Sequence, residues 1–369
     1  GTKQHIYQYK QGRIDMGESI CFIMPTMDGG GAERVVSILS GEFARSGCDV
    51  TLFLTNSTHT ACALDKRVHV DTSCAESNPN SLDQIKAIRA KMRAMPNTVF
   101  ISFMDSQNLF TLIAGIGMRN RIIISQRNDP HRAFGKRRLV RAIHPWLYAL
   151  ADCVVFQTQD ALEYYPKYAA GKYRVILNPL NNSMLPRYEG ERSKRVVTVC
   201  RLNEQKNLPL AIDAFAEFRT RFRDYTFEIY GEGALENDLK RYAVSRGVGD
   251  SVHFCGFRKD VHACIFDASM FVISSDFEGL SNSMIEAIAL GIPTIATDCP
   301  IGGARMVIDN GVNGYLVPVR NKERMVTAMC SIAGDTGVQE RFSKAGVRLR
   351  ERLSVDSISK QWLSAIKEK

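Results

Sequence analysis

The sequence lacks several patterns that would place the protein in a specialised class. None of its apolar runs reaches the roughly 18 to 20 residues that a membrane-spanning helix needs. The richest runs, residues 109–118 and 288–296, are shorter or are broken by polar residues and glycine. Its ten cysteines form no C-x-x-C pair. We therefore expect no membrane-spanning helix, zinc cluster, disulfide framework or secretory signal, and we expect reduced, mostly buried thiols in a cytoplasmic protein.

The charge balance and composition are those of a folded protein with anionic partners. Lys and Arg number 48 against 39 Asp and Glu, a net charge of +9, while hydrophobic residues make up 45% of the chain. Collagen-like, coiled-coil and disordered chains have other compositions. The positive charge favours nucleic acid, acidic lipid or phosphate-bearing ligands. Because the sequence shows no recognition helix, zinc pattern or RNA-binding aromatic pair, we do not expect a nucleic-acid partner.

Short apolar runs alternate with segments of helical periodicity, which indicates parallel sheets with helical crossovers. The predicted strands form a first series at residues 19–24, 50–54, 98–103, 121–125, 152–156 and 173–177, and a second at residues 196–200, 226–231, 252–256, 270–275, 293–297 and 314–319. We predict two doubly wound, Rossmann-like α/β domains at residues 18–182 and 183–353, joined within the polar stretch 181–194. Residues 1–17 are expected to be an extension outside the fold, natural or introduced by cloning.

A final helix is predicted at residues 354–369. It begins with a candidate cap at Ser354 or Asp356. Its apolar stripe at helical spacing, which could pack on either domain, consists of Ile358, Trp362, Leu363 and Ile366.

A glycine-rich turn follows the first predicted strand. The backbone N–H groups of Gly30 and Gly31 could approach a phosphate or a sugar closely, and the helix that follows adds positive potential. The dinucleotide pattern G-x-G-x-x-G fails because Arg34 stands where its third glycine belongs, so a dinucleotide cofactor is not expected. A purely structural tight turn is the alternative.

Further ligand-binding loops are predicted after strands of the second domain. Arg201 and Lys206 lie five residues apart in a strand-to-helix loop, where two cations can converge on one diphosphate; a solvated basic loop is the alternative. Gly231, at another strand end, permits close backbone approach to a ligand. Phe257 follows a strand that ends at Gly256 and could stack on a planar base.

The strongest candidate site is the segment at residues 274–287, S-S-D-F-E-G-L-S-N-S-M-I-E-A. Glu278 lies in the loop after a strand and Glu286 lies about one and a half turns into the next helix, so both carboxylates could face one crevice. One could accept hydrogen bonds from sugar hydroxyls and the other could chelate a ribose diol; two surface glutamates are the alternative. The N–H groups at the helix amino end suit a phosphate and belong to Gly279, Leu280, Ser281 and Asn282.

A basic, amphipathic helix is predicted at residues 134–150. Its cations, in and just before the helix, are Arg132, Lys136, Arg137, Arg138 and Arg141. Its apolar stripe consists of Leu139, Ile143, Trp146, Leu147 and Leu150. Such a helix can lie on an anionic bilayer or bind a lipid diphosphate, but a stripe that forms domain core is the alternative. Pro145 predicts a kink or a break.

The motifs together resemble family 4 of the retaining glycosyltransferases, over nearly all of residues 18–369. The motifs are G-G-G-A-E-R-V, R-L-N-E-Q-K-N-L, Y-G-E-G, F-x-G and E-G-L-S-N-S-M-I-E. The resemblance implies the B-type fold, with an N-terminal acceptor-binding and a C-terminal nucleotide-sugar-binding domain facing each other across a cleft. It also implies that the last helix crosses back to the first domain.

The resemblance implies roles for residues of the second domain. Arg201 and Lys206 would neutralise a donor diphosphate, and these two with Glu278 are the predicted catalytic residues. Glu278 would contact the sugar hydroxyls, Glu286 the ribose, and Phe257 would border the base. Gly30, Gly31, Gly231 and residues 279–282 complete the predicted donor site. No cofactor or metal is expected, and the sequence contains no D-x-D triplet to hold a divalent ion.

The first domain departs from the family pattern. Many members have a histidine after the strand that here reads R-I-I-I-S, where this chain has Gln126, Arg127 and Asn128, with His131 further on. Arg127 and Asn128 are therefore the candidates for the side chain that lies under the transferred sugar or contacts the acceptor.

The first domain also resembles bacterial transferases that extend undecaprenyl-diphosphate-linked glycans, including the N-acetylgalactosamine-adding enzymes of protein glycosylation, in the segments V-F-I-S-F-M-D-S-Q-N and R-I-I-I-S and in the basic helix. We therefore expect a metal-independent transfer of a hexose or N-acetylhexosamine from a UDP-sugar to a lipid-linked glycan for surface polysaccharide or glycoprotein. The expected partners are a nucleotide-sugar, the lipid-linked acceptor and an anionic membrane, on the cytoplasmic face of the cell membrane. The alternatives are a nucleotide-sugar 2-epimerase on a similar fold and a non-catalytic basic binding protein.

Overall fold

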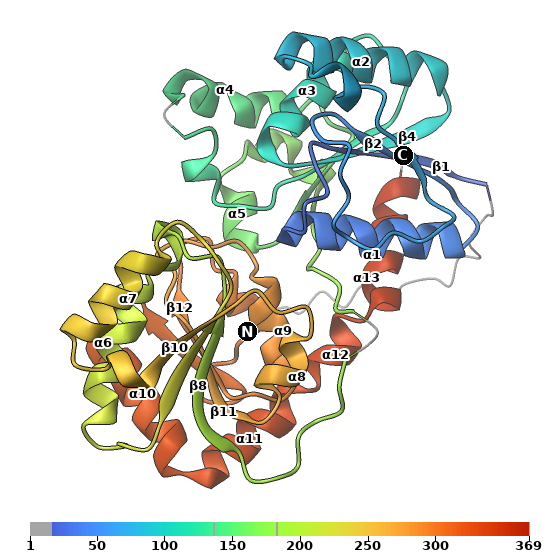
Figure 1. Ribbon diagram of the computed structural model, residues 1–369. Helices are drawn as coiled ribbons and strands as arrows, with labels where there is room; N and C mark the ends of the chain where they lie inside the picture. Colours follow the sequence, from blue (N-terminus) through green and yellow to red (C-terminus); the bar gives the residue numbers. More distant parts are fainter. Residues whose placement is uncertain (1–16, 136, 182–183, 369) are drawn as a thin grey trace.

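The protein is built from two parallel β-sheets, each with helices on its faces (Figure 1). The computed structural model describes residues 17–135, 137–181 and 184–368. The strands of the first sheet are β1 (Ser19–Met24), β2 (Asp49–Leu54), β3 (His69–Asp71), β4 (Thr98–Phe103), β5 (Ile122–Ser125), β6 (Cys153–Phe156) and β7 (Tyr173–Val175). Those of the second are β8 (Ser193–Val199), β9 (Thr226–Tyr230), β10 (Val252–Gly256), β11 (Ala268–Ile273), β12 (Thr294–Asp298) and β13 (Gly314–Pro318).

Both sheets have the same topology. Within the described ranges the first sheet has the order β3-β2-β1-β4-β5-β6-β7 and the second β10-β9-β8-β11-β12-β13. In each, the order reverses at the first strand, between β1 and β4 and between β8 and β11, which defines a doubly wound fold. The predicted fold class, two Rossmann-like domains, is confirmed.

The helices connect successive strands. Those that follow strands of the first sheet are α1 (Gly31–Arg45), α2 (Ser81–Ala94), α3 (Asp105–Gly115), α4 (Arg138–Tyr148) and α5 (Gln159–Glu163). Those of the second half are α6 (Leu208–Arg219), α7 (Glu236–Ser245), α8 (Val261–Ile265), α9 (Asn282–Ala289), α10 (Lys322–Gly334), α11 (Thr336–Gly346), α12 (Leu349–Arg352) and α13 (Val355–Lys367). Short 3₁₀ helices are η1 (Ala75–Ser77), η2 (Pro130–Arg132), η3 (Lys167–Lys172), η4 (Glu204–Lys206), η5 (Gly249–Ser251) and η6 (Ala304–Met306).

The central strands are apolar along their length because both faces of each sheet are covered. In β1, successive side chains point to opposite faces. Phe22 packs against Phe43 of α1 with the ring centroids 6.1 Å apart, while Ile23 lies in the core cluster on the other face with Ile88 of α2. This double burial explains why the strands read as unbroken apolar runs.

The last helix returns to the first domain, as the resemblance implies. Ser354 caps α13 by accepting a hydrogen bond from the backbone N–H of Ser357 at 3.2 Å. Trp362 is fully buried and stacks on Phe103 of β4 with the ring centroids 5.6 Å apart. In Figure 1, α13 runs from the second domain up to α1 of the first.

The basic helix α4 is shorter than predicted. It begins at Arg138 because Phe134 and Gly135 adopt left-handed backbone conformations, with φ of 61° and 54°. Pro145 lies inside α4 and does not end it. Proline removes the N–H that would bond to the carbonyl of Arg141, but the ring Nδ1 of His144 lies 2.7 Å from that carbonyl and satisfies it. Of the predicted kink or break at Pro145, the break does not occur, and the kink stays a prediction.

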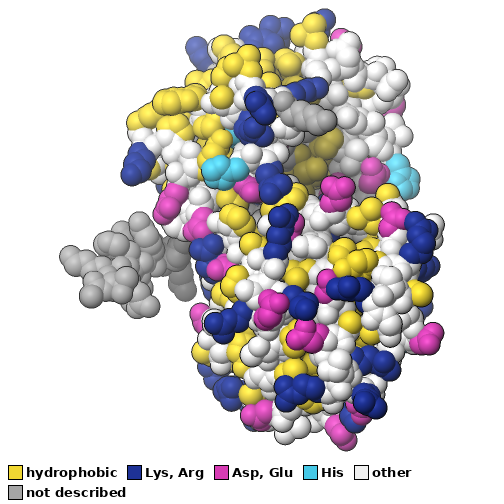
Figure 2. All heavy atoms as spheres, turned by 90° about the vertical axis from the view of Figure 1, so that its left-hand side faces the viewer, with side chains coloured by type: hydrophobic (Ala, Val, Ile, Leu, Met, Phe, Trp, Pro, Cys, Tyr) yellow, Lys and Arg dark blue, Asp and Glu magenta, His cyan; other side chains and the backbone are white. Residues whose placement is uncertain are grey.

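The apolar stripe of α4 faces solvent, so its interpretation as domain core is wrong. The exposed fractions are 73% for Leu139, 44% for Ile143, 60% for Trp146 and 57% for Leu150, and only Leu147 is partly buried. The opposite face of α4 carries its buried residues. Figure 2 looks onto the side of the molecule where α4 lies, and hydrophobic side chains gather on its upper part beside Lys and Arg.

Several expectations concern the chain as a whole. The predicted extension at residues 1–17 lies outside the described residues except for Gly17, and the predicted boundary at residues 182 and 183 does too. All ten cysteines are free and are buried or partly buried. Among the described helices, none is both long enough and apolar enough to span a bilayer.

Candidate functional site

The carboxyl ends of the strands of both sheets open onto one cleft with a volume of about 350 Å³. Its walls come from the segments that follow β1, β4, β5, β6 and β7 in the first half of the chain and β8 and β11 in the second. These include both points at which the strand order reverses, where doubly wound sheets bind their ligands. The fold therefore predicts the cleft as the functional site.

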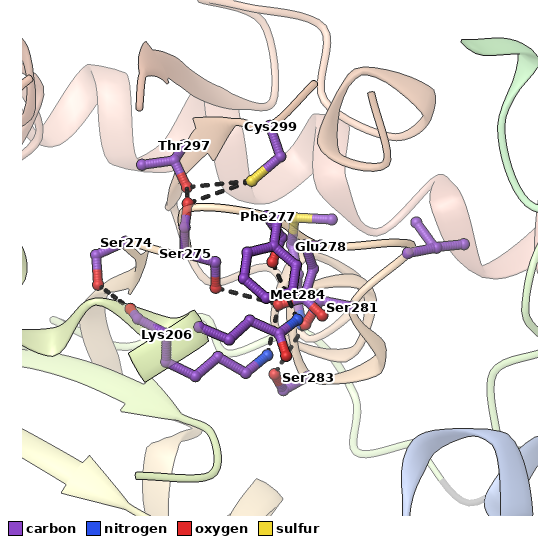
Figure 3. A network of polar contacts seen from close by, with 12 residues as sticks. Lys206, Ser274, Ser275, Phe277, Glu278, Ser281, Ser283, Met284, Thr297 and Cys299 are labelled. Atoms are coloured by element: carbon purple, nitrogen blue, oxygen red, sulfur yellow. Dashed lines mark hydrogen bonds and ion pairs between the residues drawn. The ribbon is translucent and has the colours of Figure 1, made fainter. Parts of the chain in front are cut away.

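Lys206 and Glu278 form an ion pair on the second-domain wall (Figure 3). Lys206 Nζ lies 2.5 Å from Glu278 Oε2, and the two side chains are 13% and 18% exposed. Ser275 Oγ donates to the same carboxylate at 3.1 Å, and Ser274 Oγ donates to the backbone carbonyl of Lys206 at 2.8 Å. The structure thus brings these two predicted catalytic residues into direct contact.

The amino end of α9 lies on the same wall. Ser281 caps the helix, since its Oγ accepts from the N–H of Met284 at 3.4 Å. Leu280, Ser281 and Asn282 line the cleft, as predicted. The Leu280 N–H donates to Gln157 Oε1 of the first domain at 3.3 Å. Helix amino ends attract anions, so this wall suits a phosphate.

Arg201 adds an uncommitted cation to this wall. It is exposed in the cleft, and no ion pair or hydrogen bond of its guanidinium is found within the described residues. The adjacent Cys200 is no candidate nucleophile, because burial raises the pKa of its thiol to about 11. In the part of the chain that the structure describes, no group of three or more His, Cys, Asp or Glu could hold a metal ion.

Glu286 is bound across the domain boundary. Its Oε1 lies 2.5 Å from Nη2 of Arg34, and its Oε2 lies 2.9 Å from Nε2 of His262. Arg34 belongs to α1 and lines the cleft, whereas Glu286 is 7% exposed and does not. The expectation that both glutamates face the crevice therefore holds for Glu278 alone, because Arg34 occupies the carboxylate of Glu286.

The glycine-rich turn faces the α9 segment. Gly30 is the residue before the first turn of α1, and no side chain caps that helix end. Gly30 and Gly31 both line the cleft, and Asn282 Nδ2 donates to the carbonyl of Gly31 at 3.0 Å. Two loops predicted separately as ligand-binding thus meet across the cleft.

The two first-domain candidates differ in their surroundings. Arg127 and Asn128 both line the cleft. The Arg127 guanidinium lies 4.5 Å from the ring centroid of Phe103 and 5.7 Å from that of Trp362, and burial lowers its pKa to about 9. Asn128 is exposed. Asn128 is therefore the more accessible of the two to a ligand.

Gly231 and Phe257 are not brought into the cleft lining. Gly231 has φ of 124°, and a Cβ there would lie 2.0 Å from the carbonyl oxygen of Cys200. A glycine is therefore required at position 231 for this loop to pack against the end of β8. Phe257 is 65% exposed. Gly279 also lies outside the lining, packed against the backbone of Arg127, where an added Cβ would be 2.4 Å from the carbonyl oxygen.

The basic residues near α4 divide into two groups. Arg132 stacks on Phe277 of the second domain, 4.1 Å from the ring centroid, so it contacts the cleft rim. Arg137 and Arg138 are exposed, and Arg141 donates to the carbonyl of Gly135 at 3.1 Å. Lys136 lies outside the described residues.

Four residues of the site were not selected from the sequence, namely Arg34 as a partner of Glu286, His262, Gln157 and Asn178. Gln157 and Asn178 each follow a strand of the first sheet. Polar residues at the carboxyl ends of parallel strands are the signal that could have identified these two. No local pattern marks His262.

Comparisons with known proteins agree with this geometry. Residues 193–335 match the family model described as glycosyl transferases group 1. A Campylobacter jejuni alpha-1,4-N-acetyl-D-galactosaminyltransferase, named for a diNAcBac-PP-undecaprenol glycan, is 24% identical over 360 residues, covering 95% of this chain and 98% of its own. A second C. jejuni enzyme, a 4-alpha-N-acetylgalactosaminyltransferase named for a diphospho-undecaprenol glycan, is 24% identical and covers 88% and 93%.

A solved structure extends the comparison to the fold. Anabaena HepE, in complex with UDP and glucose, has a TM-score of 0.80 at 17% identity and covers 95% of this chain and 100% of its own. Likeness at this identity shows the shared fold. Taken with the family match in the second domain and the full-length relatives, it identifies the chain as a glycosyltransferase with the B-type fold.

Proposed function

We propose that the chain is a retaining transferase that moves a hexose or N-acetylhexosamine from a UDP-sugar to a growing undecaprenyl-diphosphate-linked glycan, for surface polysaccharide or glycoprotein synthesis. The observation that carries the proposal is the second-domain wall, where Arg201, Lys206 and the amino end of α9 surround Glu278. Two full-length relatives named for undecaprenol-linked glycans support the acceptor class.

The donor diphosphate would lie against Arg201, Lys206 and the N–H groups at the start of α9. Lys206 already contacts Glu278, so a phosphate bound there sits beside the carboxylate proposed to accept hydrogen bonds from the sugar. Following the resemblance, Glu286 would contact the ribose after Arg34 releases its carboxylate, and Phe257 would border the base, although neither residue lines the cleft in this structure. The choice of uracil rests on the resemblance.

The proposed chemistry is the one that the resemblance to retaining glycosyltransferases implies. The bond between the anomeric carbon and the diphosphate oxygen breaks, an acceptor hydroxyl bonds to that carbon on the same face, and the hydroxyl proton passes to the departing diphosphate. Preorganised cations and helix dipoles stabilise such developing negative charge. Arg201 and Lys206 are proposed to do so without a metal ion, and no side chain is assigned as a general base.

The surface of α4 supports a membrane-bound acceptor. Trp146 is exposed and stacks on the equally exposed Tyr168 with the ring centroids 5.9 Å apart, and Arg137 and Arg138 lie exposed at the start of the helix. Exposed aromatic and aliphatic side chains beside arginines are typical of helices that lie in an anionic bilayer surface. We propose that α4 docks the protein peripherally on the cytoplasmic face of the cell membrane.

A thermal-shift screen without added metal tests the donor. Ligand binding to the folded state raises its stability by about 2.7 kcal/mol when the ligand is at 100 times its Kd. UDP and one UDP-sugar should raise Tm, while the guanosine and adenosine diphosphates should not. No shift with any nucleotide would contradict the proposed donor. Release of UDP together with an elongated acceptor would exclude the epimerase alternative.

Vesicle binding tests the role of α4. The double variants Trp146→Ser/Leu150→Ser and Arg137→Glu/Arg138→Glu should lose binding to anionic vesicles and activity on a lipid-linked acceptor. Val244 on α7, which is 68% exposed, provides the control Val244→Ser. Unchanged vesicle binding and activity in both double variants would refute docking through α4.

A further inference from the structure

Asn178 is a fully hydrogen-bonded residue in the segment that joins the two sheets. It follows β7, is 3% exposed, and uses all four hydrogen-bonding positions of its amide. Its Oδ1 accepts from Arg127 Nη1 and Gln157 Nε2, both at 2.6 Å. Its Nδ2 donates to Asn282 Oδ1 at 2.6 Å and to the carbonyl of Leu280 at 3.3 Å. One side chain thus connects two first-domain residues to the start of α9.

The orientation of this amide is fixed by its partners. A guanidinium can only donate and a backbone carbonyl can only accept, so Oδ1 must face Arg127 and Nδ2 must face Leu280. The same logic orients Asn282, whose Nδ2 then donates to the carbonyl of Gly31 at 3.0 Å. Gln157 is likewise left with Oε1 free to accept from the Leu280 N–H at 3.3 Å. This is the one orientation of the three amides in which each of these contacts joins a donor to an acceptor.

The network lies where the two chain crossings between the domains meet. The Leu180 N–H, two residues after Asn178, donates to the carbonyl of Leu353 at 2.8 Å, which joins the linker to the segment before α13. Arg127 rests on the ring of Trp362 in α13. Its Nε and Nη2 are shielded from solvent and have no hydrogen-bond partner within the described residues. Asn178 is therefore the polar contact that ties this buried cation to the second domain.

We propose that Asn178 is a positioning residue: it holds the α9 loop, residues 279–282, in the position relative to the first domain that donor binding requires when the two domains close on each other. This inference rests on the proposed function, because the α9 loop is the proposed diphosphate site. Asn178 lines the cleft, but protein groups occupy all the hydrogen-bonding positions of its amide. The amide therefore has no group left to bind a ligand. Its effect would pass through Leu280 and Asn282.

The variant Asn178→Asp separates positioning from simple packing. The carboxylate has nearly the same shape, keeps both acceptor positions and is compensated by the charge of Arg127, so we expect Tm to fall less than for the same change at a site without a cation. It loses both donations and places a negative oxygen against the Leu280 carbonyl and Asn282 Oδ1. We therefore expect kcat to fall about tenfold or more, with weaker UDP binding.

Asn108 provides the matched control. It is fully buried inside the first domain, accepts from Ser102 Oγ at 2.7 Å and donates to the carbonyl of Ser125 at 2.9 Å. Asn108→Asp makes the same chemical change where no cation is in contact, so it should lower Tm while leaving UDP affinity unchanged in the folded fraction.

A double-mutant cycle keeps the test decisive if Asn178→Asp folds poorly. Asn178→Ser and Asn282→Ala each break the contact between these residues, from opposite ends. If Asn178 acts through Asn282, their separate losses in kcat should fail to add in the double variant. Additive losses, or wild-type kcat and UDP affinity in Asn178→Asp, would overturn the inference. Absence of UDP binding by the unaltered protein would instead overturn the proposed function.

Discussion

At the scale of single residues, the cleft is organised by charges that already have partners. Glu278 is paired with Lys206, and Glu286 with Arg34 and His262, so the carboxylates of both glutamates have partners in the protein. A bound donor diphosphate would be a second anionic partner for Lys206, beside Glu278, and the first anionic partner for Arg201 within the described residues. The two glutamates should therefore respond differently to removal.

We predict that removal of the two glutamates affects different quantities, sugar transfer for Glu278 and UDP binding for Glu286. Glu278→Ala should lower sugar transfer by about 100-fold while sparing UDP binding, because the freed Lys206 can turn fully to the diphosphate. Glu286→Ala should weaken UDP binding about tenfold, because a charged hydrogen-bond acceptor for the ribose is lost. Calorimetry with UDP and initial rates of transfer measure the two effects.

Glu340 supplies the control for these glutamate variants. It lies on α11 of the same half of the protein, pairs with Arg187 at 2.9 Å and is half exposed, so Glu340→Ala should change neither quantity. Equal UDP affinity in Glu278→Ala, Glu286→Ala and the unaltered protein would remove Glu286 from its assigned role.

The residue-level site could be predicted in part. Lys206 and Glu278 follow β8 and β11, neighbouring strands whose carboxyl ends meet at one edge, so their convergence followed from topology. The pairing of Glu286 with Arg34 could not be predicted, because it depends on how two domains with their own cores are set against each other.

At the scale of one element, α4 shows how a helix accommodates an internal proline. The Nδ1 of His144 takes the place of the missing N–H at position 145, and its Nε2 lies 3.2 Å from the hydroxyl of Tyr165. Because the Arg141 carbonyl can only accept, Nδ1 must carry the proton in the neutral ring. One buried histidine thereby maintains the continuity of the helix.

We predict that the cost of losing His144 depends on Pro145. In the unaltered background, His144→Ala leaves the Arg141 carbonyl unsatisfied, which should cost about 1–3 kcal/mol of unfolding free energy beyond the lost ring packing. In the Pro145→Ala background the backbone N–H returns and the cost should be smaller by that amount. Urea unfolding of the four proteins measures it, and equal costs in both backgrounds would contradict this account.

Acid should destabilise the protein through the same ring. Burial lowers the pKa of His144 in the folded protein from 6.5. Below about pH 6.5 the unfolded chain therefore takes up a proton that the folded ring resists, so stability falls until the pH passes the lowered pKa. His144→Ala should show a smaller loss of stability in this window, as read from urea midpoints against pH. An identical acid dependence would argue against the assignment.

Among the elements, strands were more predictable than helix orientation. Strands such as β4 and β11 are buried throughout, so their composition alone marks them. The direction in which the apolar stripe of α4 points was not predictable. Helical periodicity identifies an apolar face, but it does not show whether the domain core or another partner covers that face. The start of α4 at Arg138, after Phe134 and Gly135, depends on left-handed backbone that Phe rarely adopts.

At the scale of the whole molecule, contacts at several places hold the two domains together across the cleft. Besides Arg34 with Glu286, Arg305 of the second domain lies 3.1 Å from Asp160 of the first, and Arg132 stacks on Phe277. These contacts lie around a cleft whose two walls both contribute candidate residues. The separation of the domains therefore sets the geometry of the site.

Gly279 tests whether this separation is needed for transfer. A Cβ at Gly279 would lie 2.4 Å from the carbonyl oxygen of Arg127 and 2.9 Å from Gln157 Oε1, both in the other domain. Gly279→Ala should therefore leave each domain folded but hold them apart, with a larger radius of gyration in X-ray scattering with UDP and transfer reduced about tenfold or more.

Gly171 is the control for that substitution. An added Cβ there meets nothing within 4 Å, so Gly171→Ala should match the unaltered protein in scattering and rate. A larger radius of gyration with wild-type transfer in Gly279→Ala would show that the domains tolerate a wider cleft, and wild-type scattering would show that the added Cβ does not hold the domains apart.

The domain architecture was predictable from the sequence because two similar series of strands and helices restart on either side of a polar stretch. The same strand order in both sheets follows from right-handed crossovers, which restrict the possible topologies. The contacts that close the cleft are few and long-range, so no local pattern encodes them.

The most direct measurement of the central claim follows both products of one reaction. The protein is incubated with each UDP-sugar and an undecaprenyl-diphosphate-linked glycan, and UDP release and acceptor mass are measured together. We predict equal amounts of UDP and of acceptor lengthened by the transferred sugar, linked with the anomeric configuration of the donor. Turnover that leaves the acceptor unchanged, an inverted linkage, or no turnover with any nucleotide-sugar would contradict the account.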